Sequence, residues 1–139
     1  IIHVDTILAN LIFGPDTEEF EQAMQNLGLL LGFQSTRPEK ETKRLGPDNL
    51  WAIGNQTYLL IECKSKADNS TLSRDYCNQL GGSVRWFSDE YGKDCKCIPI
   101  LIHVSTVIDE SATAVENMRV INEKKLEILK ILVRNLNYK

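Results

Sequence analysis

The chain has 139 residues, of which 42% are hydrophobic and 25% are charged, proportions typical of a globular domain with a sizeable core. No run of about 18 apolar residues occurs, which excludes a transmembrane helix. The net charge of −3 argues against a protein that coats nucleic acid non-specifically, because such proteins are usually basic.

We expect one domain over residues 1–139. Its start at Ile1 rather than Met suggests that it is excised from a larger protein. No basic segment precedes the apolar stretch 7–13, so we expect no signal peptide. The spacing of the cysteines does not fit a zinc site, and we interpret them as free thiols of a reducing, cytoplasmic compartment. They are Cys63, Cys77, Cys95 and Cys97.

Residues 2–13 are apolar and fit either a short helix or a peripheral strand. Gly14-Pro15 then breaks the chain. Asp16, with Glu19 three residues later, predicts a capping box at the start of a helix that ends at Gly32. Residues 33–37 predict a strand, which Pro38 ends.

Two β-rich runs follow in the sequence, at residues 48–53 and 57–64. The residues Gly54-Asn55-Gln56 between them predict a hairpin with a three-residue loop. Thr71 or Ser73 can cap a helix that reaches about Phe87. Residues 97–104 predict a buried strand, and residues 119–121 a short edge strand. The order predicts an α/β domain with a mixed central sheet flanked by helices.

A last amphipathic helix is predicted after Asn122, which can cap it. Its apolar residues recur at helical spacing and predict one buried face. They are Leu126, Leu129, Val133 and Leu136.

Acidic and basic side chains gather near the predicted hairpin. Asp48 follows Gly46-Pro47 at the start of the first strand. Glu62 and Lys64 lie two apart at the end of the second strand, so they point to the same face. Two carboxylates and an ammonium group at one strand end predict a divalent-metal site with a lysine beside it. Such a site suits hydrolysis of a phosphodiester.

The predicted element order, together with Pro47-Asp48 and Glu62-Cys63-Lys64, resembles the PD-(D/E)XK nuclease superfamily over about residues 16–104. The resemblance implies a restriction-endonuclease-like αβββαβ core. It also implies that Asp48 is the first acid of the motif, Glu62 the second acid and Lys64 the lysine.

The resemblance implies two further site residues. Glu21 corresponds to the glutamate of the first helix that often joins the site in this family. Periodicity alone places Glu21 and Glu19 on opposite flanks of the helix's apolar face and does not choose between them. Gln79 corresponds to a glutamine that some members carry on the helix after the lysine.

The function that follows is a Mg²⁺- or Mn²⁺-dependent nuclease that hydrolyses DNA. Asp48, Glu62 and the backbone carbonyl of Cys63 would hold the metal. Lys64 would orient the attacking water and stabilise charge that develops in the transition state. Polar and basic side chains around this centre would contact DNA. They are Gln79, Lys66, Arg44 and Lys43.

Two other functions stay open. The same fold could bind nucleic acid, or dock to another domain of a helicase, repair or defence protein, without cutting. An interaction domain could instead pair its last helix with a partner. A homodimer is compatible with these functions, and a membrane partner is not expected.

The remaining side chains carry weaker signals. No Gly-x-Ser-x-Gly motif occurs, so we interpret His103 as structural. Trp51, Trp86 and Tyr91 could stack on bases, although packing is the usual role of isolated aromatic residues.

Overall fold

The computed structural model describes residues 3–42 and 45–137. Helices and strands follow one another along the chain, and the sequence-based order of elements is confirmed with one addition, the short helix α3. The elements are α1 (Val4–Asn10), α2 (Thr17–Leu30), β1 (Gln34–Thr36), α3 (Pro38–Glu41), β2 (Asn49–Gly54), β3 (Thr57–Cys63), α4 (Arg74–Tyr91), β4 (Lys96–Ile102), β5 (Arg119–Ile121) and α5 (Glu123–Asn137).

The strands of the described residues form one five-stranded mixed sheet in the order β1-β2-β3-β4-β5. The pairs β1–β2 and β2–β3 are antiparallel, whereas β3–β4 and β4–β5 are parallel. The change of direction at β3 follows from the connections, because a hairpin joins β2 to β3 and the crossover helix α4 joins β3 to β4.

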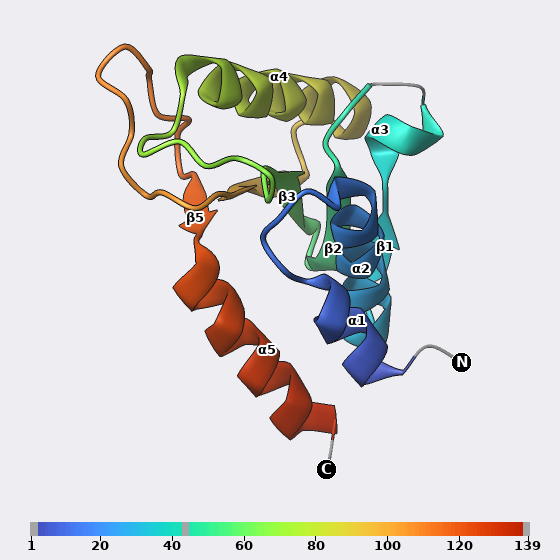
Figure 1. The fold of residues 1–139 in the computed structure, drawn as a ribbon. Coiled ribbons are helices and arrows are strands. Elements are labelled where there is room, and N and C mark those ends of the chain that lie inside the picture. The colour runs from blue at the N-terminus through green and yellow to red at the C-terminus, as the bar shows by residue number, and fades with distance from the viewer. Residues whose placement is uncertain (1–2, 43–44, 138–139) are drawn as a thin grey trace.

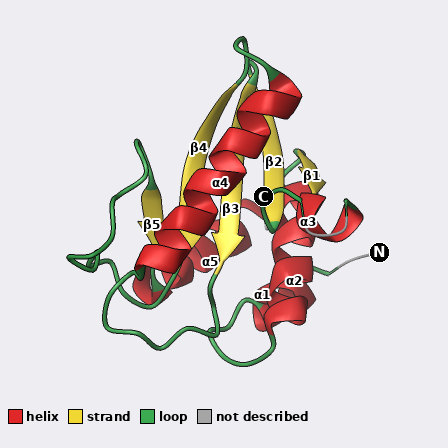
Figure 2. Cartoon of the chain, turned by 90° about the horizontal axis from the view of Figure 1, so that it is seen from above, coloured by secondary structure: helices red, strands yellow, loops and turns green. Residues whose placement is uncertain are grey.

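Helices cover both faces of this sheet (Figures 1 and 2). Helix α4 lies on one face, where its buried residues Leu80 and Phe87 pack with Leu60 and Leu101 of the strands. Helices α1, α2 and α5 lie on the other face and enclose a separate apolar core. The predicted α/β architecture, a mixed sheet flanked by helices, is therefore confirmed.

Two predictions about the N-terminal helices are settled by the structure. The apolar segment that fitted either a helix or a strand is helix α1. Asp16 does precede α2, but its side chain makes no capping hydrogen bond, so the predicted capping box is wrong. Helix α2 still forms because Phe20, Met24 and Leu27 bury one face of it.

The hairpin between β2 and β3 is confirmed, but its loop is shorter than predicted. Gly54 pairs with Thr57, which leaves a two-residue turn of Asn55 and Gln56. Both turn residues have positive φ, 53° and 57°, as a turn whose twist matches that of the flanking strands requires. Because the register of β2 against β3 shifts between Ala52 and Gly54, Gly54 pairs with Thr57 and belongs to β2 rather than to the loop.

The largest correction concerns Pro38, which was expected only to end a strand. It occupies the first turn of α3, where the missing N–H costs nothing and the fixed φ favours a helix. This four-residue helix carries Glu39 toward Asp48, the residue that directly precedes β2.

The later helices begin where the sequence predicts. The Oγ of Ser73 accepts a hydrogen bond from the Tyr76 amide at 3.1 Å, and the Oδ1 of Asn122 accepts one from the Lys125 amide at 3.0 Å. Leu126 and Val133 of α5 are buried, but Leu136, predicted on the same face, is 62% exposed. None of the helices within residues 3–42 and 45–137 is both long and apolar enough to cross a membrane.

Candidate metal centre

A cleft of about 890 Å³ opens at the edge of the sheet where β3 ends. Helix α4 lines one side of it, and α3 with the loop before β2 lines the other. Asp48, Glu62 and Lys64, which the sequence predicts to lie together, all line this cleft. The predicted convergence at one sheet edge is therefore what the structure contains.

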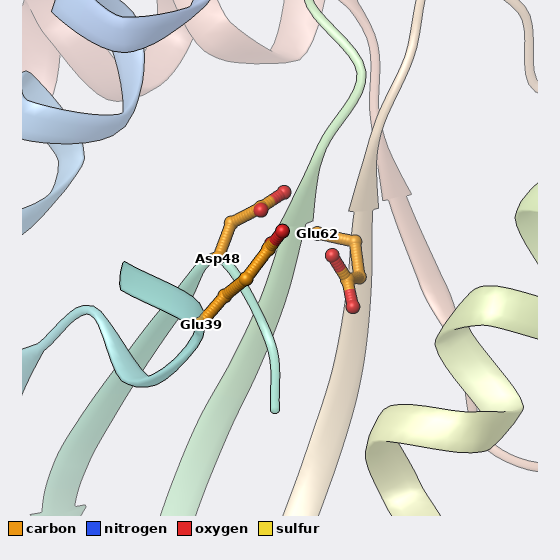
Figure 3. Close-up of side chains that lie close together, drawn as sticks. All are labelled: Glu39, Asp48 and Glu62. Atoms are coloured by element: carbon orange, nitrogen blue, oxygen red, sulfur yellow. The ribbon is translucent and has the colours of Figure 1, made fainter. Parts of the chain in front are cut away.

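Three carboxyl groups meet in the cleft (Figure 3). Glu39 of α3, Asp48 and Glu62 of β3 each offer an oxygen, and these oxygens all lie within 4.8 Å of one another. Pairing of Asn49 with Ile61 in the β2–β3 hairpin brings Asp48 beside Glu62. The third member, Glu39, approaches from a segment outside the sheet.

Local backbone geometry brings α3 to Asp48. The amide of Glu39 donates a hydrogen bond to the carbonyl of Pro47 at 3.1 Å. Gly46 has a φ of 90°, and a side chain there would meet the Pro38 Cβ at 2.9 Å and the Trp86 ring at 3.0 Å. Glycine is therefore required at position 46 both for the turn and for the close approach of α3.

Backbone and side-chain donors orient two of the acids. The buried Asp48 accepts a hydrogen bond from the Cys63 amide at 2.7 Å. The buried Glu62 accepts one from the hydroxyl of Ser83 on α4. Both carboxyl groups are thus held in place from opposite sides of the cleft, and neither is free to turn into solvent.

These carboxyl groups hold their protons more tightly than usual. Burial raises the pKa of Asp48 to about 7. The hydrogen bond to Asp48, followed by burial, raises the pKa of Glu39 to about 7. Burial also raises the pKa of Glu62. A cluster of this kind retains protons near neutral pH unless a cation replaces them.

Lys64 lies beside the cluster and shares a cleft wall with α4. Its Nζ is 4.9 Å from the centre of the Tyr76 ring, a cation–π distance. The positive charge of Lys64 lowers the pKa values of Glu39 and Glu62, but this effect is smaller than the effects that raise them. The lysine is thus close enough to act electrostatically on the carboxylates and on anything that they hold.

Glu21 also lines the cleft, whereas Glu19 is exposed on α2. The Glu21 carboxylate accepts a hydrogen bond from Arg37 at 2.9 Å and does not belong to the three-carboxyl cluster. Burial raises its pKa, and the Arg37 hydrogen bond opposes that rise. The structure therefore places Glu21 at the cleft wall, and its role in the reaction stays a prediction.

The other predicted site residues lie in different places. Cys63 lines the cleft, and burial raises the pKa of its thiol well above the usual value, so the thiol stays neutral. Lys66 and Gln79 line the cleft as well. Lys43 and Arg44 lie outside the described residues.

Sequence reasoning missed three residues of this site, Glu39, Ser83 and Tyr76. The signal for Glu39 was Pro38 followed by charged helix-forming residues, which is typical of a first helical turn. Ser83 and Tyr76 are seven apart on α4 and therefore share a face, but only the packed structure shows that this face meets the cleft.

No protein-family model, curated protein or solved structure matches this chain. The chemistry of the cleft must therefore be judged from its own geometry.

Proposed function

We propose that this chain is a Mg²⁺-dependent deoxyribonuclease of the PD-(D/E)XK type. The observation that carries the proposal is the cluster of Glu39, Asp48 and Glu62, whose oxygens lie within 4.8 Å of one another with Lys64 lining the same cleft. Carboxylate oxygens are the ligands that Mg²⁺ prefers, and a neighbouring lysine suits a reaction that builds negative charge on a phosphate.

The order of elements supports the same proposal. Helix α2, strands β1 to β3, helix α4 and strand β4 follow the αβββαβ order that the resemblance implies, with α3 inserted before β2. Glu62 lies on β3, and Asp48 directly precedes β2, the antiparallel neighbour of β3 in that core. We propose on this basis that the core is restriction-endonuclease-like.

The residues present fit a hard divalent cation. Mg²⁺ takes oxygen ligands at about 2.0–2.1 Å in octahedral geometry, which puts neighbouring ligand oxygens about 3 Å apart. The three carboxyl oxygens of the cluster lie within 4.8 Å of one another, close enough for all three to face one ion. The raised pKa values of Asp48 and Glu39 also fit a cation site, because a bound cation would replace the protons that the cluster otherwise keeps.

In this mechanism Asp48, Glu39 and Glu62 would hold the ion, with the Cys63 carbonyl as the further ligand expected from sequence. A bound Mg²⁺ would polarise the scissile phosphate and acidify a water molecule. Lys64 orients the attacking water and stabilises the charge that develops on the phosphate oxygens. Lys66 and Gln79 would contact the phosphate backbone, and Glu21, at the cleft wall, would hold a second metal or a metal-bound water.

The test is cleavage of plasmid, branched and single-stranded DNA with Mg²⁺ or Mn²⁺. Lys64→Ala should lower the cleavage rate by about a hundredfold or more while metal binding is kept, because an ammonium group cannot ligate a cation. Asp48→Asn should weaken metal binding. Lys40→Ala is the matched control, since Lys40 is exposed and pairs with Glu18 outside the cluster.

Three results would contradict the proposal. Cleavage by Lys64→Ala at the wild-type rate would remove the lysine from the active site. A wild-type protein that binds DNA but cuts none would support the alternative, a non-cleaving nucleic-acid-binding or docking module of the same fold. Failure to bind Mn²⁺ or DNA would favour a protein-interaction domain.

A further inference from the structure

Helix α4 presents one face to the cleft, and part of that face is not used by the metal cluster. Tyr76, Gln79, Ser83 and Trp86 recur at helical spacing along it, with Gly82 beside them. Ser83 is bonded to Glu62 and Tyr76 lies under Lys64. Gly82 and Trp86 have no such partner in the cluster, and their presence on this face needs a separate explanation.

Gly82 is costly where it stands, because glycine is the least favourable residue in a helix interior after proline. Packing does not explain it. A Cβ at Gly82 would come near only the Nη2 of Arg85, at an ordinary 3.7 Å. At Gly28 of α2, in contrast, a Cβ would meet Ser35 and the Trp51 ring at 2.6 Å. The space above Gly82 therefore opens into the cleft rather than onto a neighbouring side chain.

Trp86 lies one turn further along the same face, partly exposed. A Cβ at Gly46 would come within 3.0 Å of the Trp86 ring, so the ring lies against the same turn that places Asp48. The neighbouring aromatic residues Phe87, Tyr91 and Tyr58 pack on one another, with ring centres 4.7–5.2 Å apart. Trp86 meets Tyr91 edge-on, with ring centres 6.1 Å apart, and packs against the apolar core, yet it is only partly buried and lines the cleft.

The charges that line the cleft indicate what kind of ligand ring could stack on Trp86. The chain has a net charge of −3, and five carboxyl groups line the cleft, those of Glu21, Asp68 and the metal cluster. Among the described residues, the cationic side chains that line it are Lys64 and Lys66. A duplex bound through long rows of phosphate contacts needs many more cations. Stacking of a base on an aromatic ring needs no cation, and only bases that are unpaired or splayed out can stack in this way.

We infer that the α4 face formed by Gly82 and Trp86 binds an unpaired nucleobase next to the metal centre, and that the preferred substrate is therefore single-stranded DNA. This inference rests on the proposed nuclease function. Gly82 lets the base and sugar approach the helix backbone, and Trp86 supplies the stacking surface. Gln79, an exposed amide one turn earlier, faces the same space and can bond to the base edge or the sugar–phosphate.

The test is equilibrium binding of a short single-stranded oligodeoxynucleotide and of its blunt duplex, by fluorescence anisotropy with Ca²⁺ in place of Mg²⁺. The wild type should bind the single strand more tightly than the duplex. Trp86→Leu should bind the single strand about 5- to 150-fold more weakly, the range expected for loss of one stacked base, and Trp86→Phe should keep most of the affinity.

Gly82→Ala and Gly81→Ala form the matched pair. Gly81 does not line the cleft, and a Cβ there meets only ordinary contacts at 3.7 and 3.8 Å. Both changes should raise the midpoint of thermal unfolding, because alanine favours the helix. Only Gly82→Ala should weaken single-strand binding, by about fivefold or more, since its methyl group enters the occupied space.

Intrinsic fluorescence gives a second readout. Trp51 is buried with its Nε1 bonded to the carbonyl of Met24, so quenching by the oligonucleotide should come from Trp86 and disappear in Trp86→Phe. The inference is overturned if the duplex binds as tightly as the single strand, or if Trp86→Leu and Gly82→Ala both bind like the wild type while Mg²⁺-dependent cleavage persists. A wild type that neither binds nor cuts DNA overturns the proposed function as well.

Discussion

Two groups of acidic side chains flank helix α3, and their charges are balanced in opposite ways. In the first group the buried Arg37 donates hydrogen bonds to Glu18 at 2.9 and 3.0 Å and to Glu21 at 2.9 Å. Hydrogen bonds from Arg37 and then Lys40 lower the pKa of Glu18 to about 2. In the second group, Glu39, Asp48 and Glu62 face one another, and no guanidinium group of residues 3–42 and 45–137 bonds to them.

We interpret the first group as a structural use of acidic residues and the second as the functional use that we propose. The Arg37 group fastens α2 to the segment before α3, and each of its charges has a partner. The second group opposes folding when its carboxyl groups are ionised, because buried like charges repel and each carboxylate loses its hydration. Strongly shifted acids gathered in a cleft are typical of functional sites, and here the missing positive charge is what a bound cation would bring.

The largest effect should come from removing the cation of the first group. Arg37→Met leaves Glu18 and the half-buried Glu21 without their partner, and we expect it to lower the free energy of unfolding by about 3 kcal/mol. Lys40→Met removes an exposed partner of the same Glu18 and should cost less than about 1 kcal/mol. Urea unfolding measures both. Equal losses would mean that Arg37 does not carry the network.

Adding a divalent cation should affect only the second group. At a Mg²⁺ concentration one hundred times the dissociation constant, the wild type should gain about 2.7 kcal/mol of stability. Glu62→Gln should lose most of this gain, and Glu18→Gln should keep it. Thermal unfolding with and without Mg²⁺ decides between them. If both variants lose the gain equally, the ion binds outside the cleft.

Neutralising one acid should change the stability of the metal-free protein in opposite directions in the two groups. The pKa of Asp48 rises from 3.8 to about 7 on folding, so the metal-free protein loses stability as pH rises from about 4 to 7. Asp48→Asn removes this loss and should stabilise the metal-free protein at pH 8 by about 2 kcal/mol, with little change at pH 4.

Glu18→Gln is the comparison for that experiment. The lowered pKa of Glu18 stabilises the protein above pH 4, so its loss should destabilise at pH 8. The effect should stay below about 1 kcal/mol, because Glu18 is largely exposed. Urea unfolding at pH 4 and pH 8 measures both variants. Destabilisation by Asp48→Asn at pH 8 would show that the cluster does not oppose folding.

The raised pKa values also predict that metal binding depends on pH. The hydrogen-bonded pair of Asp48 and Glu39 has raised pKa values near 7, so a cation must displace protons below that pH. Affinity for Mn²⁺ should fall about tenfold per pH unit for each displaced proton below pH 7 and level off above pH 8. Calorimetry in two buffers of different ionisation enthalpy measures the affinity and the protons released. An unchanged affinity from pH 6 to pH 8 would contradict the shifted values.

Much of the site followed from local sequence alone. Glu62 and Lys64 share a face because side chains alternate along a strand, and Asp48 lies beside Glu62 because a short hairpin fixes the register of β2 on β3. The helices α2, α4 and α5 were predictable for a similar reason. Their apolar residues recur with the helical period, and capping residues mark the starts of α4 and α5.

Tertiary structure decided what periodicity does not encode. Helix α3 is too short to show a repeat, so only its contact with Gly46 and Pro47 reveals that Glu39 joins the cluster. Glu21 was predicted to belong to the active site, yet Arg37, sixteen residues further along the chain, bonds its carboxylate at the cleft wall. Both outcomes depend on contacts between segments distant in sequence, whose loops no local pattern specifies.

The α4 face shows the same division. The sequence determines that Tyr76, Gln79, Ser83 and Trp86 lie on one side of a helix, because they recur at intervals of three and four residues. The packing of α4 over the end of β3 decides that this side lines the cleft, with Ser83 bonded to Glu62 and Tyr76 under Lys64. Sequence sets which side chains share a face, and burial of the sheet against the helix sets what that face meets.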